Sequence, residues 1–414
     1  MASNNVLDDE ACQAHVRPMD QKPALVVFAA IGLDAVGIGL VFPILPRLLD
    51  EVTHAEHAAP YIGITAALYA VMQFLFAPLL GALSDSVGRR PVLLVSLAGA
   101  ALNYVLMALA QELWVLLLAR ALAGLTSANI SVATAYLTDI TPEDQRARRF
   151  GMLNAMFGIG FIVGPILGGV LGDHGLRSPF VAAAALNLGN FVLAALVLPE
   201  SRAPLKAGGA RLALNPLQPL RWLRSQPELV PLTLVFFILS AAGEVYGSCW
   251  ALWSYDLFRW NGTWIGLSLG AFGVSHALVS ATLPGLAVRH LGERGSLLSG
   301  MAGAGLALVV LAFVHRGWVV FTLMPLLALQ GIGTPALQAR ATRGVDSALQ
   351  GQLQGVLASA VSAASIVAPL AFTALYQRFR PWWPGAIWLS VIAMLLAAVP
   401  LILHRGPSEG RGGR

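Results

Sequence analysis

The feature of this sequence that most constrains its fold is a series of twelve long apolar runs separated by short polar loops. Each run is close to the ~20 residues that an α-helix needs to cross a lipid bilayer. Lipid offers no hydrogen-bond partners, so a spanning segment is either a helix or a strand of a closed barrel, and these runs lack the alternation typical of barrel strands. We therefore predict an all-α membrane protein with twelve transmembrane helices. The predicted spans are residues 24–47, 60–82, 91–110, 113–138, 150–172, 179–198, 229–253, 263–287, 294–314, 317–339, 351–374 and 384–404.

The composition supports a membrane protein and excludes several other classes. Charged residues make up only 11% of the chain and the mean hydropathy is +0.71, whereas a soluble domain carries about 25% charged residues. A cytosolic enzyme, a secreted domain and a nucleic-acid-binding protein are therefore excluded, although the isoelectric point is about 9.6. The sequence has no Walker A, HExxH or GxSxG motif and no set of Cys and His ligands. We therefore expect neither an enzyme, nor an ATP-driven pump, nor a bound metal or other cofactor.

Basic residues are distributed unevenly between the two sets of loops. The loops that follow the even-numbered spans hold 14 Lys or Arg residues, and the loops on the opposite side hold 6. In membrane proteins the loops rich in Lys and Arg remain in the cytoplasm. Both termini and the long central loop are therefore predicted to be cytoplasmic.

The chain divides into two halves of six predicted spans each. We assign residues 1–22 to a cytoplasmic tail, 23–198 to the first half, 199–228 to a cytoplasmic linker, 229–404 to the second half and 405–414 to a second tail. The halves share five identical residues at a constant offset of 204, namely Gly81 and Gly285, Gly88 and Gly292, Trp114 and Trp318, Gly151 and Gly355, and Pro165 and Pro369. Two related six-helix bundles that enclose a cavity are the architecture of a secondary transporter.

The loop after the second span has an unusual concentration of Gly and charge. It reads GALSDSVGRRP and contains Gly81, Asp85, Gly88, Arg89 and Arg90. An Asp at a helix end can bind an Arg or a neighbouring helix N-terminus and so hold a cytoplasmic gate shut. Asp139, which ends the fourth span, is a candidate partner for Arg89. The alternative is a turn flanked by ordinary cytoplasmic charge.

These motifs resemble those of the major facilitator superfamily. GALSDSVGRRP resembles the signature loop between its second and third helices, and ARALAG, with Arg120, resembles its fourth-helix Arg motif. GIGFIVGPILGG resembles the fifth-helix motif of drug:proton antiporters. The residues of that antiporter motif are Gly160, Gly164, Pro165, Gly168 and Gly169.

Four further stretches are similar to the tetracycline efflux proteins of Gram-negative bacteria. They are residues 33–49, 81–100, 331–339 and 351–376. The resemblance implies an inner-membrane antiporter that expels a tetracycline–divalent metal complex in exchange for protons, with a small-molecule drug, protons and lipid as its partners and no nucleic acid. We expect it to act as a monomer. A proton-coupled exporter of another amphiphilic drug or metabolite remains the alternative, and a membrane receptor that transports nothing is a third hypothesis.

Three Asp, Glu or Arg residues lie well inside predicted spans, where burial of a charge is costly and marks function. Asp34 lies near the middle of the first span and matches a family Asp, so we expect it to bind a substrate cation and a proton in turn. Glu244 stands where the family usually has Gln, and together with Asp34 it provides one carboxylate from each half. Arg120 is the candidate cationic partner in proton coupling. For each of the three, a structural tie between helices is the alternative.

This chain differs from the family that it resembles at several positions expected to contact the substrate. This chain has Asn103 and Ala304 where the family carries Asp in its third and ninth spans, and Tyr61 where it carries His, which favours the alternative substrate. A lone polar residue on a membrane helix can also join two helices, and an aromatic residue can belong to the interfacial belt. The candidate substrate-binding residues are Tyr61, Gln73, Asn103, Asn129, Trp250 and His276.

Overall fold

The computed structural model describes residues 21–54, 59–201, 218–342 and 349–403, and within these ranges the chain is helical with no strand. The first group of helices comprises α2 (Gln21–Val41), α3 (Leu45–Thr53), α4 (Ala59–Val87), α5 (Arg89–Leu109), α6 (Leu113–Leu125), α7 (Asn129–Ile140), α8 (Glu143–His174) and α9 (Ser178–Val197). The second comprises α10 (Gln218–Arg224), η1 (Pro227–Leu229), α11 (Val230–Phe258), α12 (Gly262–Phe313), α13 (Gly317–Ala328), η2 (Leu329–Ile332), α14 (Gly333–Thr342), α15 (Gln350–Phe379) and α16 (Ala386–Leu403).

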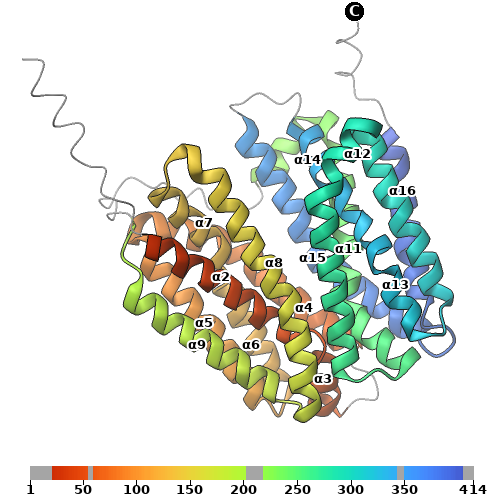
Figure 1. The fold of residues 1–414 in the computed structure, drawn as a ribbon, viewed down its shortest axis with the longest axis horizontal. Helices are drawn as coiled ribbons and strands as arrows, with labels where there is room; N and C mark the ends of the chain where they lie inside the picture. Colours follow the sequence, from red (N-terminus) through yellow and green to blue (C-terminus); the bar gives the residue numbers. More distant parts are fainter. Residues whose placement is uncertain (1–20, 55–58, 202–217, 343–348, 404–414) are drawn as a thin grey trace, which may run out of the picture.

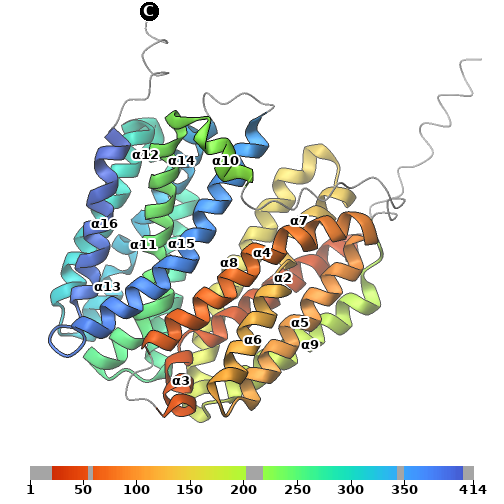
Figure 2. The ribbon, with the colours of Figure 1, turned by 180° about the vertical axis from the view of Figure 1, so that it is seen from behind.

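The helices form two bundles that lie side by side, α2–α9 in one and α11–α16 in the other (Figures 1 and 2). Eleven of the described helical segments are long and apolar enough to cross a membrane. One of them, α12, is 52 residues long and contains a kink at Gly292, whose φ of 70° is non-helical. A left-handed backbone favours glycine, and this kink separates the predicted spans 263–287 and 294–314. The all-α prediction with twelve spans in two bundles is therefore confirmed.

Three predicted spans are interrupted. The first breaks at residues 42–44 between α2 and α3, the fourth at residues 126–128 between α6 and α7, and the tenth passes through η2. Pro43 lies in the first break, where it removes one backbone donor. Irregular backbone at membrane depth is tolerated where it is buried in protein or lines a cavity, and Phe42, Thr126 and Ser127 do line the central cavity.

Most of the predicted tails and linker lie outside the described residues, which exclude 1–20, 202–217 and 404–414. The short helix α10 falls within the predicted linker and contains Arg221 and Trp222. The division of the chain into these segments stays a prediction.

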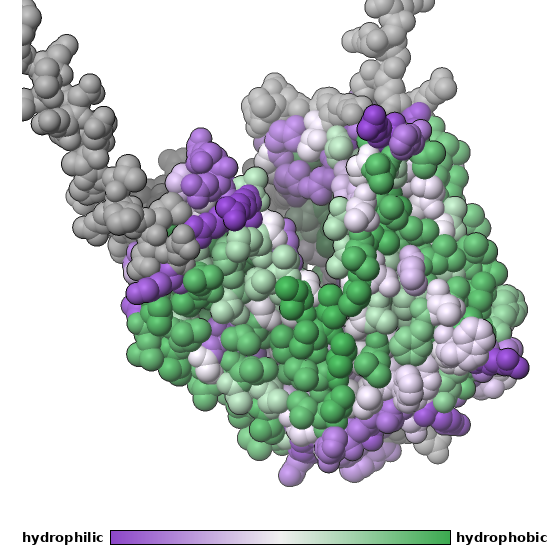
Figure 3. Space-filling model, viewed as in Figure 1, coloured by the Kyte–Doolittle hydropathy of each residue, from purple (hydrophilic) through white to green (hydrophobic). Residues whose placement is uncertain are grey.

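Apolar side chains cover the flanks of both bundles. Figure 3 shows hydrophobic residues over the sides and hydrophilic residues concentrated at the two ends. Large apolar side chains are exposed there, for example Leu196 at 81% exposure and Leu109 at 68%. In water such a surface would be unfavourable, but in a bilayer it is the surface that faces lipid. The molecule is a multi-pass membrane protein.

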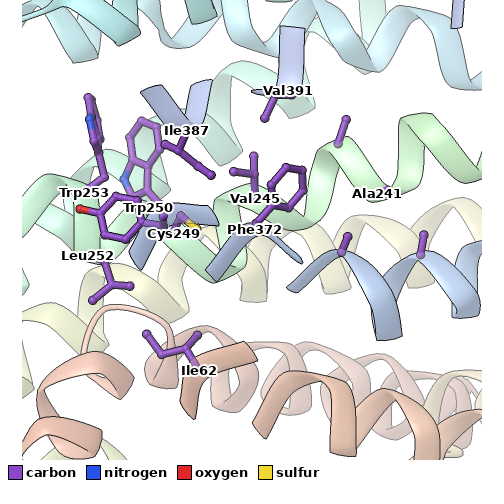
Figure 4. Close-up of a cluster of buried hydrophobic side chains, with 14 of the residues drawn as sticks. Ile62, Ala241, Val245, Cys249, Trp250, Leu252, Trp253, Phe372, Ile387 and Val391 are labelled. Carbon is purple, nitrogen blue, oxygen red and sulfur yellow. The ribbon is translucent and has the colours of Figure 1, made fainter. Parts of the chain in front are cut away.

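The bundles contact one another mainly where α8 packs against α12 and α4 packs against α15, and α4 also contacts α11. A buried cluster of large side chains lies in the second bundle between α11, α15 and α16 (Figure 4). Trp250, Trp253 and Trp388 pack ring against ring there, with centroids 5.0–5.6 Å apart. Ile62 of α4 belongs to the same cluster, so this core extends across the boundary between the bundles.

Candidate functional site

A cavity of about 1530 Å³ lies between the two bundles. It is larger than the ~300–1,000 Å³ of a typical site for a drug-sized ligand. Its walls come from α2, α4, α5, α6 and α7 on one side and from α11 and α15 on the other. Gly81, Arg221, Trp222 and Gly351 line it at one end, where the hollow between the bundles is visible in Figure 3. We call this end, which carries Arg89, Arg90 and Arg221, the arginine-rich face.

Asp34 lies on α2 in the wall of this cavity and is 8% exposed. The side-chain amide of Asn129, at the start of α7, lies next to its carboxylate. The Tyr104 ring of α5 reaches the same region, since a Cβ on Gly37, one turn after Asp34, would lie 3.1 Å from its hydroxyl. Among the described residues no Lys or Arg forms an ion pair with Asp34. A substrate cation or a proton can therefore neutralise this carboxylate.

Arg120 of α6 lines the same wall. Its Nη2 donates to Asn103 Oδ1 at 2.7 Å and to Met107 Sδ at 2.8 Å, both on α5. Tyr104 of α5 is close enough to interact electrostatically with both Asp34 and Arg120. The first bundle thus presents a carboxylate and a guanidinium on one wall.

A hydroxyl and amide network continues this wall. The hydroxyls of Tyr69 and Ser127 are 2.8 Å apart, and Gln73 Nε2 donates to Ser127 Oγ at 2.8 Å and to Tyr69 Oη at 3.3 Å. Gln73 is predicted here from the sequence, whereas Tyr69, Tyr104 and Ser127 are not. The spacing of four between Tyr69 and Gln73 places both on one helix face and is the signal that would have found Tyr69.

The opposite wall comes from the second bundle and is built mainly of small and hydroxyl side chains. Glu244 of α11 faces the cavity, and its Oε1 accepts a hydrogen bond of 2.6 Å from Ser365 of α15. Among the lining residues, Asp34 and Glu244 are the two acidic groups, one from each bundle. No group of three or more His, Cys, Asp or Glu residues in the described part of the chain is placed to hold a metal ion.

Three predicted substrate contacts lie away from the cavity. Trp250 is 2% exposed in the aromatic core of the second bundle, where its Nε1 donates to Ser268 Oγ at 2.9 Å. His276 packs against the Phe272 ring, and Tyr61 packs against the large core cluster. Ala304 is fully buried and also absent from the lining. By contrast Gln73, Asn103 and Asn129 are in the wall.

The charged loop of the arginine-rich face forms a compact cluster around Arg89. Its guanidinium contacts Asp85 at 2.6 Å, Asp139 at 3.2 Å and the Ser84 hydroxyl at 2.6 Å. Glu200, after α9, accepts from the backbone N–H of Arg89 at 2.8 Å and of Arg90 at 3.2 Å. Each of these contacts lies within the first bundle or joins it to the segment that directly follows α9. The predicted Arg89–Asp139 pair is therefore present, but it does not join the two bundles in this conformation.

The glycines of α8 allow two close helix contacts. A Cβ on Gly160, Gly164 or Gly168 would overlap the backbone of α2, and a Cβ on Gly169 would overlap the carbonyl oxygen of Gly262 on α12. Pro165 lies against Gly39 of α2, and its carbonyl lies against Gly266 of α12. The antiporter motif thus packs one helix against its own bundle and against the other bundle.

Asp173, near the end of α8, makes a contact between the bundles that the sequence analysis missed. Its carboxylate accepts from the backbone N–H of Gly262 and of Thr263, each at 2.9 Å, and from the Thr263 hydroxyl at 2.7 Å. Arg47 of α3 adds an ion pair at 3.2 Å. An acidic group at a helix N-terminus is stabilised by the free N–H groups and the helix dipole. We call this end of the molecule, with Arg47, Gly169, Asp173, Gly262 and Thr263, the closed face.

A cavity between two membrane-embedded helical bundles, closed at one face, defines a transporter of the major facilitator class. The family model described as Major Facilitator Superfamily matches residues 27–257. The crystal structure of a mutant of the nucleoside transporter NupG superposes with a TM-score of 0.78 at 12% identity, covering 92% of this chain and 98% of that one. The crystal structure of the human organic anion transporter MFSD10 (TETRAN) superposes with a TM-score of 0.66 at 22% identity, covering 93% of this chain and 100% of that one.

Comparison with relatives of similar sequence assigns the chain to a smaller family within this superfamily. The class C tetracycline resistance protein of Escherichia coli is 46% identical over 382 residues, which are 92% of this chain and 96% of the relative. The class G tetracycline resistance protein of Vibrio anguillarum is 45% identical, and the match covers 92% of this chain and 96% of the relative. The chain therefore belongs to the major facilitator superfamily and, within it, to the family of the tetracycline resistance proteins.

Proposed function

We propose that this protein exports an antibiotic of the tetracycline class from the cytoplasm in exchange for protons, by alternating access across a bacterial inner membrane. The observation that carries the proposal is the pair of carboxylates, Asp34 and Glu244, which face one cavity from opposite bundles. The relatives named for tetracycline resistance support the substrate class.

The exchange follows from competition for the cavity carboxylates. A proton and a cationic substrate each neutralise Asp34 or Glu244, so binding of one lowers the affinity for the other, and this coupling is reciprocal. When the cavity faces the cytoplasm, the substrate displaces protons. When it faces the other side, protons displace the substrate. Arg120 then acts as a fixed positive charge on the wall that eases release of a proton from neighbouring groups.

The orientation is part of the proposal. The arginine-rich face carries the loops that the positive-inside rule assigns to the cytoplasm, so the cavity is open inward. In the outward-open state Arg89, Asp85 and Asp139 would hold the cytoplasmic face together, and the glycines of α8 would allow the bundles to rock. A divalent metal would travel with the drug as part of the substrate, and a single copy would be the working unit.

A second candidate is export of a different amphiphilic drug on the same frame. Asn103 and Ala304, which replace two acidic residues of the family, favour it. A quinolone resistance protein, NorA of Staphylococcus aureus, is also similar at 23% identity over 86% of this chain and 90% of the relative. Proton coupling and Asp34 would be shared by both candidates.

The test is proton movement in inverted membrane vesicles. Addition of tetracycline with Mg²⁺ is expected to release protons from energised vesicles that contain the wild type, and much less from vesicles with Asp34→Asn or Glu244→Gln. Normal transport by Asp34→Asn would exclude the mechanism. Proton release with norfloxacin but none with tetracycline would exclude the substrate and keep the mechanism.

A further inference from the structure

Arg120 is a cation in the cavity wall with no anionic partner among the described residues. No described carboxylate lies within 4.0 Å of its guanidinium, and its two observed bonds go to neutral acceptors, Asn103 Oδ1 and Met107 Sδ. Its Nε is buried without a hydrogen-bond partner. A charge inside a membrane protein is normally paired or lines a water-filled path. The guanidinium of Arg120 is therefore a positive charge in the cavity wall to which an anionic group of a bound molecule can bind.

The remaining nitrogen, Nη1, has no partner among the described residues and is not one of the buried atoms. Since Arg120 lines the cavity, Nη1 is the donor that a bound molecule meets. Arg presents its donors in a rigid planar fork that suits an anionic oxygen better than a neutral one. The bond from Nη2 to Asn103, a residue only 2% exposed, holds that fork in place.

Asp34 completes a dipolar wall. It lies on α2 in the lining of the same cavity, and Tyr104 of α5 is close enough to interact electrostatically with both Asp34 and Arg120. Neither charge is neutralised by the other through an ion pair, because no contact within 4.0 Å joins them. A molecule with a cationic group and an anionic oxygen can therefore satisfy both charges at once, and a simple organic cation can satisfy only Asp34.

We propose that Arg120, oriented by Asn103, binds an anionic oxygen of the substrate, so that this transporter selects molecules with both a cationic group and an anionic oxygen over cations that have no anionic oxygen. The inference rests on the proposed function for the location of the substrate, and it adds which chemical group of the substrate is recognised. Tetracycline meets the requirement through its acidic enol and its amine. A quinolone meets it through its carboxylate and its amine.

The experiment measures equilibrium binding to the purified full-length protein in lipid nanodiscs with three probes: tetracycline with Mg²⁺, norfloxacin, and the ethyl ester of norfloxacin, which keeps the amine but has no carboxylate. A hydrogen bond to a charged group contributes enough for an effect of about tenfold or more. Arg120→Gln is expected to weaken binding of tetracycline and norfloxacin by about that factor and to leave binding of the ester unchanged.

Two further variants separate recognition from folding. Arg120→Lys keeps the charge without the fork, so the two acidic probes should recover part of their affinity. Asn103→Asp places a carboxylate against Arg120, so the guanidinium is occupied and the preference for acid over ester should fall, with little change in the melting temperature.

Each result decides between the proposals. If Arg120→Gln weakens binding of all three probes equally, Arg120 has a structural role and the inference is wrong. Unchanged binding of tetracycline in Arg120→Gln would also overturn it. If the wild type binds norfloxacin more tightly than its ester but does not bind tetracycline, the proposed substrate is wrong and the role of Arg120 stands. If it binds neither acidic probe, both proposals are wrong.

Discussion

The two faces of this molecule are held together in different ways. On the arginine-rich face, charged side chains contact one another within a single bundle, and the cavity opens beside them. On the closed face, the two bundles are joined by glycine contacts and by carboxylates: Asp173 binds the N-terminus of α12, and Asp50 of α3 interacts electrostatically with Arg380 at the end of α15. The conspicuous charge motif therefore does not close this conformation. Close backbone packing and a helix N-terminus do so on the opposite side.

The largest expected effect comes from removing the close backbone approach on the closed face. In Gly169→Ala the new Cβ would overlap the Gly262 carbonyl, which cannot move without moving α12. Overpacking of this kind costs about 3 kcal/mol, so the closed face should open and transport should stop. Spin labels at Leu109→Cys and Trp318→Cys, one on each bundle, would report a longer and broader distance in a chain whose native Cys12 and Cys249 are replaced.

Gly158→Ala is the matched control. Gly158 lies on the same helix, but a Cβ there would meet no atom within 4 Å. This variant should keep the wild-type distance and transport. A Gly169→Ala protein with an unchanged label distance would show that the glycine contact does not hold this face closed.

The second-largest effect is expected from a substitution on the arginine-rich face, and it should be confined to the first bundle. Arg89→Ala removes an ion-pair partner of Asp85 and Asp139 and the donor to the buried Ser84 hydroxyl, which costs about 2 kcal/mol. We expect a lower melting temperature and slower transport, with the distance between labels at 109 and 318 unchanged. Arg146→Ala is the control, because Arg146 pairs with Glu143, whose side chain is 87% exposed. A changed label distance in Arg89→Ala would mean that the two faces are coupled in this conformation.

The positions of the membrane-spanning helices can be predicted from the sequence better than the side chains that face the cavity. Span positions follow from length and apolarity alone, and Gly292 divides α12 where two spans are expected. Which side of a helix faces the cavity is not visible in hydropathy, since lipid and the protein core are both apolar. Trp250 is therefore predicted in the substrate wall but lies in an aromatic core, and the Ser365 hydroxyl that binds Glu244 was missed.

The contacts of the two faces also differ in how well they can be predicted from the sequence. Arg89 and Asp85 are four residues apart, so their contact is local and can be expected from the motif. Asp173 binds Gly262 and Thr263, which lie about 90 residues further along the chain and in the other bundle. Only the packing of α8 against α12 brings them together. Asp34, Arg120 and Glu244 were predictable because a charge within an apolar span is rare, whatever it contacts.

A smaller effect is expected from the carboxylate on the closed face. Asp173→Ala removes three hydrogen bonds to the start of α12, and loss of an N-terminal cap costs about 1–2 kcal/mol. The closed population should fall about five- to thirtyfold relative to the open one, and the labels at 109 and 318 should show a second, longer distance. Asp144→Asn, an acidic residue at the opposite end of α8, should show only the wild-type distance. A single short distance in Asp173→Ala would show that this carboxylate is not needed to keep the face closed.

The smallest effect is expected from Arg47, which adds an ion pair to Asp173 but is 44% exposed at its side chain. Exposed ion pairs contribute less than about 1 kcal/mol, so Arg47→Ala should change transport and the label distance only slightly, and the difference should shrink further at high salt. In the double variant Arg47→Ala, Asp173→Ala, the loss should equal that of Asp173→Ala alone, because Arg47 acts through Asp173. A double variant that loses clearly more than Asp173→Ala would show that Arg47 contributes to the closed face independently, and the closure would then depend on charge as well as on helix capping.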